Sequence, residues 1–182
     1  MNLIIPMAGF GTRFRKAGYS IYKPFLPIAG KTMLEHVSDL FPQHITRHLI
    51  VNPKLLTPQQ EQFLVEMPNT KVYPIREHRL GPAYSIFQAI PSLPLQESFF
   101  ISYCDITWTW DFQKVEALLG SHSPKTDGIV FTRTGFHPHL IGNPYSAFCK
   151  VDPDRPECVL EVREKESFTQ DWMSEPLSIG AF

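Results

Sequence analysis

Residues 2–13 read NLIIPMAGFGTR, an apolar run that passes directly into a loop with two glycines. The run Leu3 to Ile5 is short and apolar, which is typical of a buried strand. Ligands of open α/β sheets bind beyond the carboxyl ends of the strands, where this loop would lie. The stretch therefore predicts a buried first strand of an α/β sheet, followed by a ligand-binding loop.

The same alternation continues outward from this stretch. Further short apolar runs cover residues 48–52, 71–75 and 99–103. Helical patterns, with apolar residues three and four apart, cover residues 33–41, 83–90 and 112–119. Parallel neighbouring strands need a crossover connection, which is usually a helix. We therefore expect an α/β fold with a mostly parallel mixed sheet and helices on both of its faces.

The pattern changes after Gly128. Runs at 129–132, 146–151 and 159–163 are strand-like and are separated by loops rich in Pro, Gly and Asn, so we expect antiparallel additions. The sequence has no internal repeat and no flexible linker, so we expect residues 1–182 to form a single domain. The apolar run 177–182 reaches the last residue, which leads us to expect a chain truncated at its C-terminus.

Composition and charge argue against several classes of binding partner and of structure. The sequence has 17 Lys and Arg against 18 Asp and Glu, a formal net charge of −1, so no general positive field exists to hold a nucleic acid. The three cysteines are too few and too scattered for a disulfide framework or a CxxC zinc site, which fits a reducing cytoplasm. The apolar start lacks a preceding basic region, so it reads as a strand and not as a signal peptide or a membrane span.

The glycine loop has the composition of a phosphate-binding element. Gly9 and Gly11 let the backbone approach phosphate oxygens, and Arg13 can donate to two of them at once. The loop is neither a P-loop, which needs GxxxxGK[ST], nor a dinucleotide fingerprint, which needs a third glycine. Lys23 follows ten positions later, in a segment stiffened by Pro24 and Pro27. Paired cations beside a glycine loop are suited to phosphoryl or nucleotidyl transfer.

These residues together resemble a known family. Gly9-x-Gly11-Thr12-Arg13-Phe14, followed by Lys23-Pro24 and by Gly30-Lys31-x-Met33, is similar to the signature of sugar-phosphate nucleotidyltransferases. Glucose-1-phosphate thymidylyltransferases and uridylyltransferases belong to that family, and the likeness is strongest to its surface-polysaccharide subgroup. The resemblance implies a GT-A-like, Rossmann-like nucleotidyltransferase fold. It further implies catalytic roles for Arg13 and Lys23.

The resemblance also assigns roles outside the glycine loop. It implies nucleotide binding by Ala8, Gly9, Gly11 and Thr12, and by Gly81 in Leu80-Gly81-Pro82-Ala83, where the glycine backbone lies against the nucleobase. Asp105, at the end of an apolar run, would hold the catalytic Mg²⁺, which needs only one or two carboxylates besides phosphate.

Near the end of the chain, Glu164 and Lys165 are similar to the family element whose lysine contacts the phosphate of the sugar 1-phosphate. The sequence departs from the family pattern in having Glu166 where a proline is usual. A second metal-binding aspartate is expected beyond residue 182. Whether residues 1–182 are catalytically active without it is therefore left open.

Simpler interpretations stay open for several of these residues. Asp105 could cap a turn after its strand, and Glu164 with Lys165 could form a solvated charge cluster on an edge strand. His137 and His139 have no further ligand pattern beside them and are interpreted as loop residues. Trp108 and Trp110 either pack against a helix, which we favour, or line an acceptor pocket.

The sequence as a whole predicts transfer of a nucleoside monophosphate from a nucleoside triphosphate to a sugar 1-phosphate, with release of pyrophosphate. Two alternatives remain: a cytidylyltransferase acting on a non-sugar phosphate such as phosphocholine, and a nucleotide-binding regulatory domain without catalysis. Retention of Asp105 and Lys165 favours an enzyme. The nucleobase, the acceptor and assembly into a homo-oligomer are not determined by the sequence.

Overall fold

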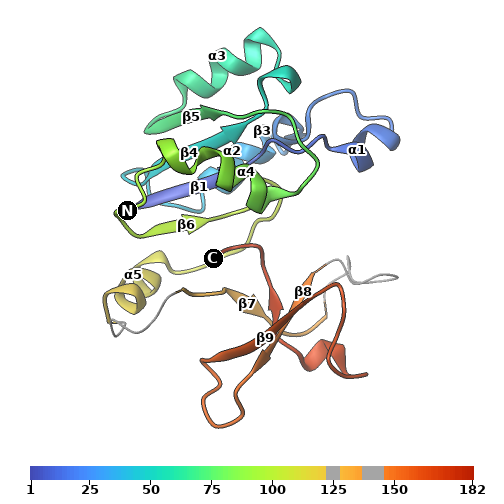
Figure 1. Cartoon of the computed structure of the whole chain (residues 1–182), viewed down its shortest axis with the longest axis vertical. Coiled ribbons are helices and arrows are strands. Elements are labelled where there is room, and N and C mark those ends of the chain that lie inside the picture. Colours follow the sequence, from blue (N-terminus) through green and yellow to red (C-terminus); the bar gives the residue numbers. More distant parts are fainter. Residues whose placement is uncertain (122–127, 137–145) are drawn as a thin grey trace. The chain divides into compact units, whose positions relative to one another are not determined.

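The computed structural model describes residues 1–121, 128–136 and 146–182. These residues fall into two compact units, Met1–Lys125 and Thr126–Phe182 (Figure 1). Each unit is described by itself below. The expectation of a single domain over residues 1–182 stays a prediction. His137 and His139 lie outside the described residues.

The first unit is built on a four-stranded sheet in the order β5-β4-β1-β6, in which all neighbours are parallel (Figure 1). Its strands are β1 (Asn2–Pro6), β4 (Thr46–Val51), β5 (Thr70–Pro74) and β6 (Phe99–Ile101). A short antiparallel hairpin, β2 (Pro27–Ile28) with β3 (Lys31–Thr32), forms a separate ribbon. The predicted parallel sheet is confirmed.

Helices lie in the crossovers between these parallel strands, and a further helix follows the last of the strands, β6. Those in the crossovers are α1 (Thr12–Lys16), α2 (Met33–Ser38), α3 (Pro58–Glu66) and α4 (Pro82–Ala89), and α5 (Phe112–Ser121) follows β6. Single 3-10 turns lie at η1 (Lys23–Phe25), η2 (Pro53–Leu55) and η3 (Ile90–Ser92). Helix α2 ends at Ser38, earlier than the predicted segment 33–41, because Leu40 and Phe41 continue in tighter turns to Val37 and Ser38.

The centre of the sheet is fully covered. All five residues of β1 are buried, which requires packing on both of its faces. On one face, Ile4 and Ile50 form a core cluster with Ala89 of α4 and with Leu93. The apolar run at residues 3–5 is therefore the middle of the core, as its composition predicts.

The two tryptophans after β6 belong to an aromatic cluster. The ring of Phe41 lies 6.2 Å from that of Trp108 and 5.2 Å from that of Trp110, both edge-on. Trp110 Nε1 donates to the carbonyl of Leu40 at 2.7 Å. Both tryptophans therefore pack against the residues that follow α2, and Trp110 also packs against a helix, since its ring lies 5.4 Å from that of Phe112 at the start of α5.

The second unit is an antiparallel sheet in the order β7-β10-β8-β9. Its strands are β7 (Thr132–Arg133), β8 (Ala147–Val151), β9 (Val159–Glu164) and β10 (Leu177–Ser178), and η5 (Trp172–Ser174) is a 3-10 turn. Phe148 and Leu177 are buried against Phe168 and Trp172. The antiparallel prediction is confirmed, although β7 begins later than residue 129 and β10 is shorter than the run 177–182.

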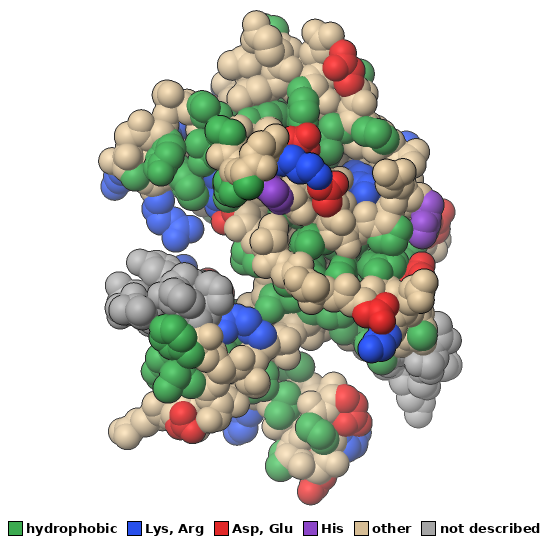
Figure 2. Space-filling view, turned by 180° about the vertical axis from the view of Figure 1, so that it is seen from behind, with side chains coloured by type: hydrophobic (Ala, Val, Ile, Leu, Met, Phe, Trp, Pro, Cys, Tyr) green, Lys and Arg blue, Asp and Glu red, His purple; other side chains and the backbone are tan. Residues whose placement is uncertain are grey.

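The surface carries both signs of charge. On the face drawn in Figure 2, Lys and Arg side chains lie in small groups, interspersed with acidic and uncharged ones. Lys31 pairs with Asp39, for example, and Lys54 with Glu77. No helix within the described residues has both the length and the apolar character that a membrane crossing requires.

Candidate functional site

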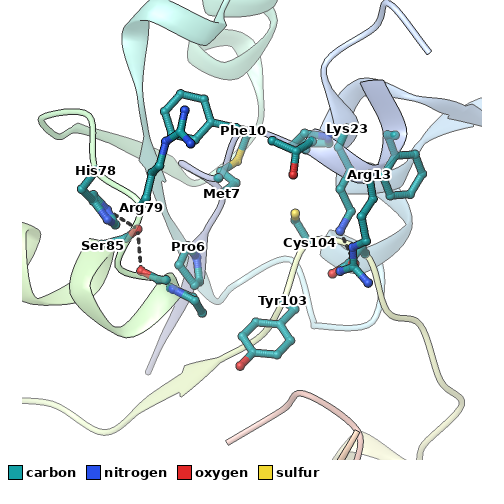
Figure 3. Close-up of a pocket in the computed structure, with 18 residues that line it drawn as sticks. Pro6, Met7, Phe10, Arg13, Lys23, His78, Arg79, Ser85, Tyr103 and Cys104 are labelled. Carbon is teal, nitrogen blue, oxygen red and sulfur yellow. Dashed lines mark hydrogen bonds and ion pairs between the residues drawn. The ribbon is translucent and has the colours of Figure 1, made fainter. Parts of the chain in front are cut away.

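A cavity of about 510 Å³ lies where β1 and β6 end. The order β5-β4-β1-β6 means that successive strands first add on one side of β1, and that β6 then adds on the other. Ligands of open α/β sheets bind at such a reversal. The walls come from four stretches of the first unit, within residues 6–14, 23–24, 78–85 and 103–105 (Figure 3).

The glycine loop forms one wall of this cavity. Gly11 has a φ of +61° and is the N-cap of α1, and it provides no side-chain hydrogen bond to the first turn. A Cβ at Gly11 would lie 3.4 Å from Cβ of Lys23, in ordinary contact, so the left-handed conformation and not crowding favours glycine here. A Cβ at Gly9 would meet nothing within 4 Å, so the protein itself leaves open space at this position.

Lys23 and Asp105 meet inside the cavity. Their side chains form an ion pair and are only 17% and 28% exposed. The ammonium of Lys23 also lies 5.2 Å from the centre of the Phe14 ring. Two residues that are far apart in the sequence therefore place one positive and one negative group beside the glycine loop.

Tyr22 holds the lysine segment in place. Its ring is buried, and its hydroxyl donates to the carbonyl of Met7 at the start of the glycine loop. Burial raises the pKa of Tyr22 above its ordinary value, so this hydroxyl remains a donor. Pro24 follows at the start of η1 and fixes the backbone beyond Lys23. The sequence analysis missed Tyr22, because its partner is a backbone carbonyl fifteen positions away.

Cys104 lines the same cavity but does not act as a nucleophile. Its side chain is buried and lines the cavity next to Asp105. Burial, together with the charge of Asp105, raises the pKa of the thiol to about 12. The thiol is therefore neutral at physiological pH, and the thiolate needed for covalent catalysis is not available.

The opposite end of the cavity is formed by the loop before α4. His78 Nε2 lies 2.9 Å from Ser85 Oγ, and the N–H of Leu80 donates to His78 Nδ1 at 3.1 Å. The guanidinium of Arg79 lies over the Phe10 ring, 5.3 Å from its centre. Gly81, with φ +87° and ψ 177°, leads into α4. Figure 3 shows Arg79, His78 and Phe10 at one end and Lys23 and Arg13 at the other.

The chain is similar in sequence to proteins of a known family. The profile of the MobA-like NTP transferase domain family matches residues 3–157, most of the chain. The chain belongs to this family. Bifunctional protein GlmU of Bacillus velezensis is 28% identical over 122 residues, covering 67% of this chain and 25% of its own. The chain spans between a quarter and about a third of the length of the curated relatives it matches.

Solved structures confirm the expected fold for this member of the MobA-like NTP transferase family. The nucleoside-diphosphate-sugar pyrophosphorylase of Vibrio cholerae superposes with a TM-score of 0.70 at 19% identity, covering 98% of this chain and 71% of that one. The inositol-1-phosphate CTP transferase of T. maritima gives a TM-score of 0.66 at 19% identity, over 99% and 68%. The fold is thus that of nucleotidyltransferases, and the sequence resemblance to their family is confirmed.

Most of the predicted nucleotide-binding residues of this family member line the cavity. Gly9, Gly11, Thr12 and Gly81 all do so. Ala8 is 5% exposed and is not among the residues that line the cavity. The cavity is also lined by Phe10, His78, Arg79 and Ser85, which the sequence analysis did not select.

Glu164 and Lys165 lie in the second unit, at the end of β9. Lys165 Nζ is 3.4 Å from Glu164 Oε1, and both side chains are mostly exposed. Lys165 has a φ of +62°, a left-handed conformation that is uncommon for a residue with a side chain. Its N–H donates to the carbonyl of Ser146 at 3.1 Å, which holds the backbone in this conformation. Non-glycine residues with this backbone conformation often occur at functional positions. The role of Lys165 in binding the acceptor phosphate stays a prediction, which this conformation supports.

The donor set at the cavity floor suits Mg²⁺ better than a transition metal. Among the described residues, no three His, Cys, Asp or Glu side chains cluster as a metal site would need. Asp105 supplies a single carboxylate beside the glycine loop. Mg²⁺ commonly binds through one or two carboxylates together with substrate phosphates and water, so one aspartate is a fitting ligand.

Proposed function

We propose that this chain transfers a nucleoside monophosphate from a nucleoside triphosphate to a sugar 1-phosphate, giving a nucleoside diphosphate sugar and pyrophosphate. The observation that carries the proposal is the convergence of the glycine loop with Lys23 and Asp105 in one cavity at the carboxyl ends of β1 and β6. Nucleotidyl transfer depends mainly on positioning and on neutralising charge around phosphorus, and this cavity is equipped for both.

The residues of the cavity take the following roles. The glycine loop 9–12 cradles the phosphates, and Arg13 neutralises charge on the pyrophosphate that leaves. Lys23 donates to the α-phosphate. Asp105 would hold Mg²⁺, which when bound supplies positive charge to the phosphate oxygens.

The reaction is a single in-line displacement. An oxygen of the acceptor phosphate attacks the α-phosphorus, a new P–O bond forms, and the bond from the α-phosphorus to the bridging oxygen of the β-phosphate breaks. The electron pair of that bond leaves with the pyrophosphate. Lys165 positions the acceptor phosphate through its ammonium, and Glu164 beside it orients that ammonium. No covalent enzyme intermediate is required, which agrees with a neutral thiol at Cys104.

A cytidylyltransferase acting on a different phosphate monoester is the second candidate. Its support is the likeness in fold to the inositol-1-phosphate CTP transferase of T. maritima. A regulatory domain without catalysis has less support, because nucleotide binding alone does not need the Lys23–Asp105 pair. A cytoplasmic location, a role in polysaccharide synthesis and assembly into a homo-oligomer all stay proposals.

The test is a substrate panel. The chain is incubated with Mg²⁺, each of ATP, GTP, CTP, UTP and dTTP, and a set of sugar 1-phosphates, inositol 1-phosphate or phosphocholine, and pyrophosphate release is measured. Release with a sugar 1-phosphate supports the proposal. Release only with CTP and phosphocholine or inositol 1-phosphate supports the second candidate. Triphosphate binding without release under any pairing points to a regulatory domain.

A further inference from the structure

At the end of the cavity remote from Lys23 and Asp105, the side chain of Arg79 donates no hydrogen bond to any residue that the structure describes. Arg79 is exposed, and its guanidinium packs on the face of Phe10. Within the described residues, this ring is the contact that the guanidinium makes, and it has no hydrogen-bond acceptor there. This contact places the cation over the face of the ring and uses none of the N–H groups to donate to an oxygen, so they are available to a ligand.

His78 and Ser85, by contrast, form a hydrogen bond with one another. His78 Nδ1 accepts from the N–H of Leu80, so the ring proton lies on Nε2 and is donated to Ser85 Oγ at 2.9 Å. The hydroxyl of Ser85 then donates to the carbonyl of Gly81 at 3.5 Å. This chain of bonds fixes the loop that carries Gly81 and leaves His78 no proton for a ligand. Among the described residues at this end, Arg79 is therefore a side chain with donors left for a ligand.

We propose that Arg79, stacked on Phe10, reads the nucleobase of the triphosphate and selects bases with two adjacent acceptor atoms. The proposal rests on the proposed function, which places the triphosphate in this cavity with its phosphates at the glycine loop. Phosphates at residues 9–13 leave the base directed toward the end of the cavity formed by Phe10, His78 and Arg79 (Figure 3).

The donor pattern of a guanidinium decides which bases fit. Two parallel N–H groups match two neighbouring acceptors, which guanine presents at O6 and N7 and cytosine presents at O2 and N3. Adenine offers an acceptor beside an amino donor. In uracil and thymine, the N3–H donor separates the two carbonyl oxygens. The chain is therefore selective for GTP or CTP over ATP, UTP and dTTP.

Calorimetric titration of the whole chain with each of the five triphosphates tests this selectivity. The wild-type chain is expected to bind GTP or CTP at least about tenfold more tightly than the other three. The better of the two identifies the base. In Arg79→Met, which keeps an apolar stem over Phe10, this preference should shrink to below about threefold. Inorganic tripolyphosphate, which has no base, should bind both forms equally.

Arg15→Met is the matched control. Arg15 is exposed on α1 and does not line the cavity, so its loss removes one charge and should leave the order of the five affinities unchanged. Thermal unfolding of each variant verifies folding. A wild-type preference for ATP, UTP or dTTP overturns the proposal, and so does a preference that Arg79→Met retains. If no triphosphate and no tripolyphosphate binds, the proposed function itself fails, and the inference fails with it.

Discussion

Lys23 and Asp105, which are 82 positions apart in the sequence, form an ion pair inside the cavity that the glycine loop lines. Each group of the pair neutralises the charge of the other. A phosphate bound to Lys23 would replace Asp105 as its partner, and a cation bound to Asp105 would replace Lys23. The two groups are therefore suited to bind a phosphate and a cation together, as a magnesium–triphosphate complex presents them.

Asp105→Asn tests this relationship. The amide keeps the size of the side chain but loses the charge that attracts a cation, so we expect the Mg²⁺ concentration needed for half-maximal activity to rise at least about tenfold. The measurement is a Mg²⁺ titration of pyrophosphate release. Asp154→Asn, an exposed aspartate in the second unit, is the control and should leave the titration unchanged. An unchanged curve for Asp105→Asn would falsify the metal assignment.

Arg13→Ala should damage catalysis without damaging the fold. Arg13 is exposed and lines the cavity, so its loss leaves no cavity in the core. A positioned cation at transferring phosphates contributes several kcal/mol to the transition state, and we expect turnover to fall at least about a hundredfold. Pyrophosphate release and thermal unfolding are measured together. Arg15→Ala on the same helix is the control, and near-normal turnover in Arg13→Ala would contradict the assignment.

Gly81→Ala and Gly9→Ala should separate a backbone requirement from a ligand requirement. Gly81 has φ +87° and ψ 177°, a region that is almost restricted to glycine, so alanine there should cost about 1–3 kcal/mol of unfolding free energy. Gly9 lies outside the positive φ region and has open space around it, so alanine should be nearly neutral for stability.

The prediction for ligand binding at Gly9 is the reverse. The added methyl group of Gly9→Ala would stand where the backbone should approach the phosphates, so affinity for tripolyphosphate should fall although the stability does not. Urea unfolding and calorimetry measure the two effects. Equal stability of the two variants would show that the conformation at Gly81 is not strained for alanine.

The parts of this structure that sequence could predict are those set by local pattern. The run at Leu3 to Ile5 is buried throughout, and a fully buried parallel strand reads as a continuous apolar run. Helix α3 was missed because its apolar residues give only a weak helical period. Its start was nevertheless marked, since Thr57 and Gln60 form a capping box around Pro58.

Some residues of the candidate site could likewise be predicted from the sequence, and others only from the structure. Gly11 and Arg13 belong to one short motif and could be selected from it, whereas the contacts of Tyr22 with Met7 and of His78 with Ser85 exist only after folding. Arg79 has no motif at all, and its position over Phe10 depends on two loops that meet at the cavity. Such residues could be found only from the structure, because nothing in their own neighbourhood in the sequence specifies their partners.

His48 lies in the middle of β4, and we expect it to make the first unit sensitive to acid. Its side chain is fully buried, with Nε2 2.9 Å from Asn2 Oδ1 and Nδ1 2.8 Å from the hydroxyl of Tyr73. The amide oxygen of Asn2 can only accept, so Nε2 carries the proton and Nδ1 accepts from Tyr73. Burial, helped by the charge of Lys71 and opposed by that of Glu97, lowers the pKa of His48 below 6.5.

This lowered pKa predicts the direction of the pH dependence. Below pH 6.5 the unfolded chain takes up a proton at His48 that the folded chain resists, so acidification favours unfolding. The stabilisation by neutral His48 is fully present above pH 6.5 and is lost as the pH falls from there through the folded pKa, with a slope of at most about 1.4 kcal/mol per pH unit. His48→Gln can keep a donor and an acceptor but does not titrate, so its unfolding free energy should fall less between pH 7 and pH 5.5. Urea unfolding of both proteins at several pH values measures the difference, and parallel curves would show that His48 does not carry the acid sensitivity.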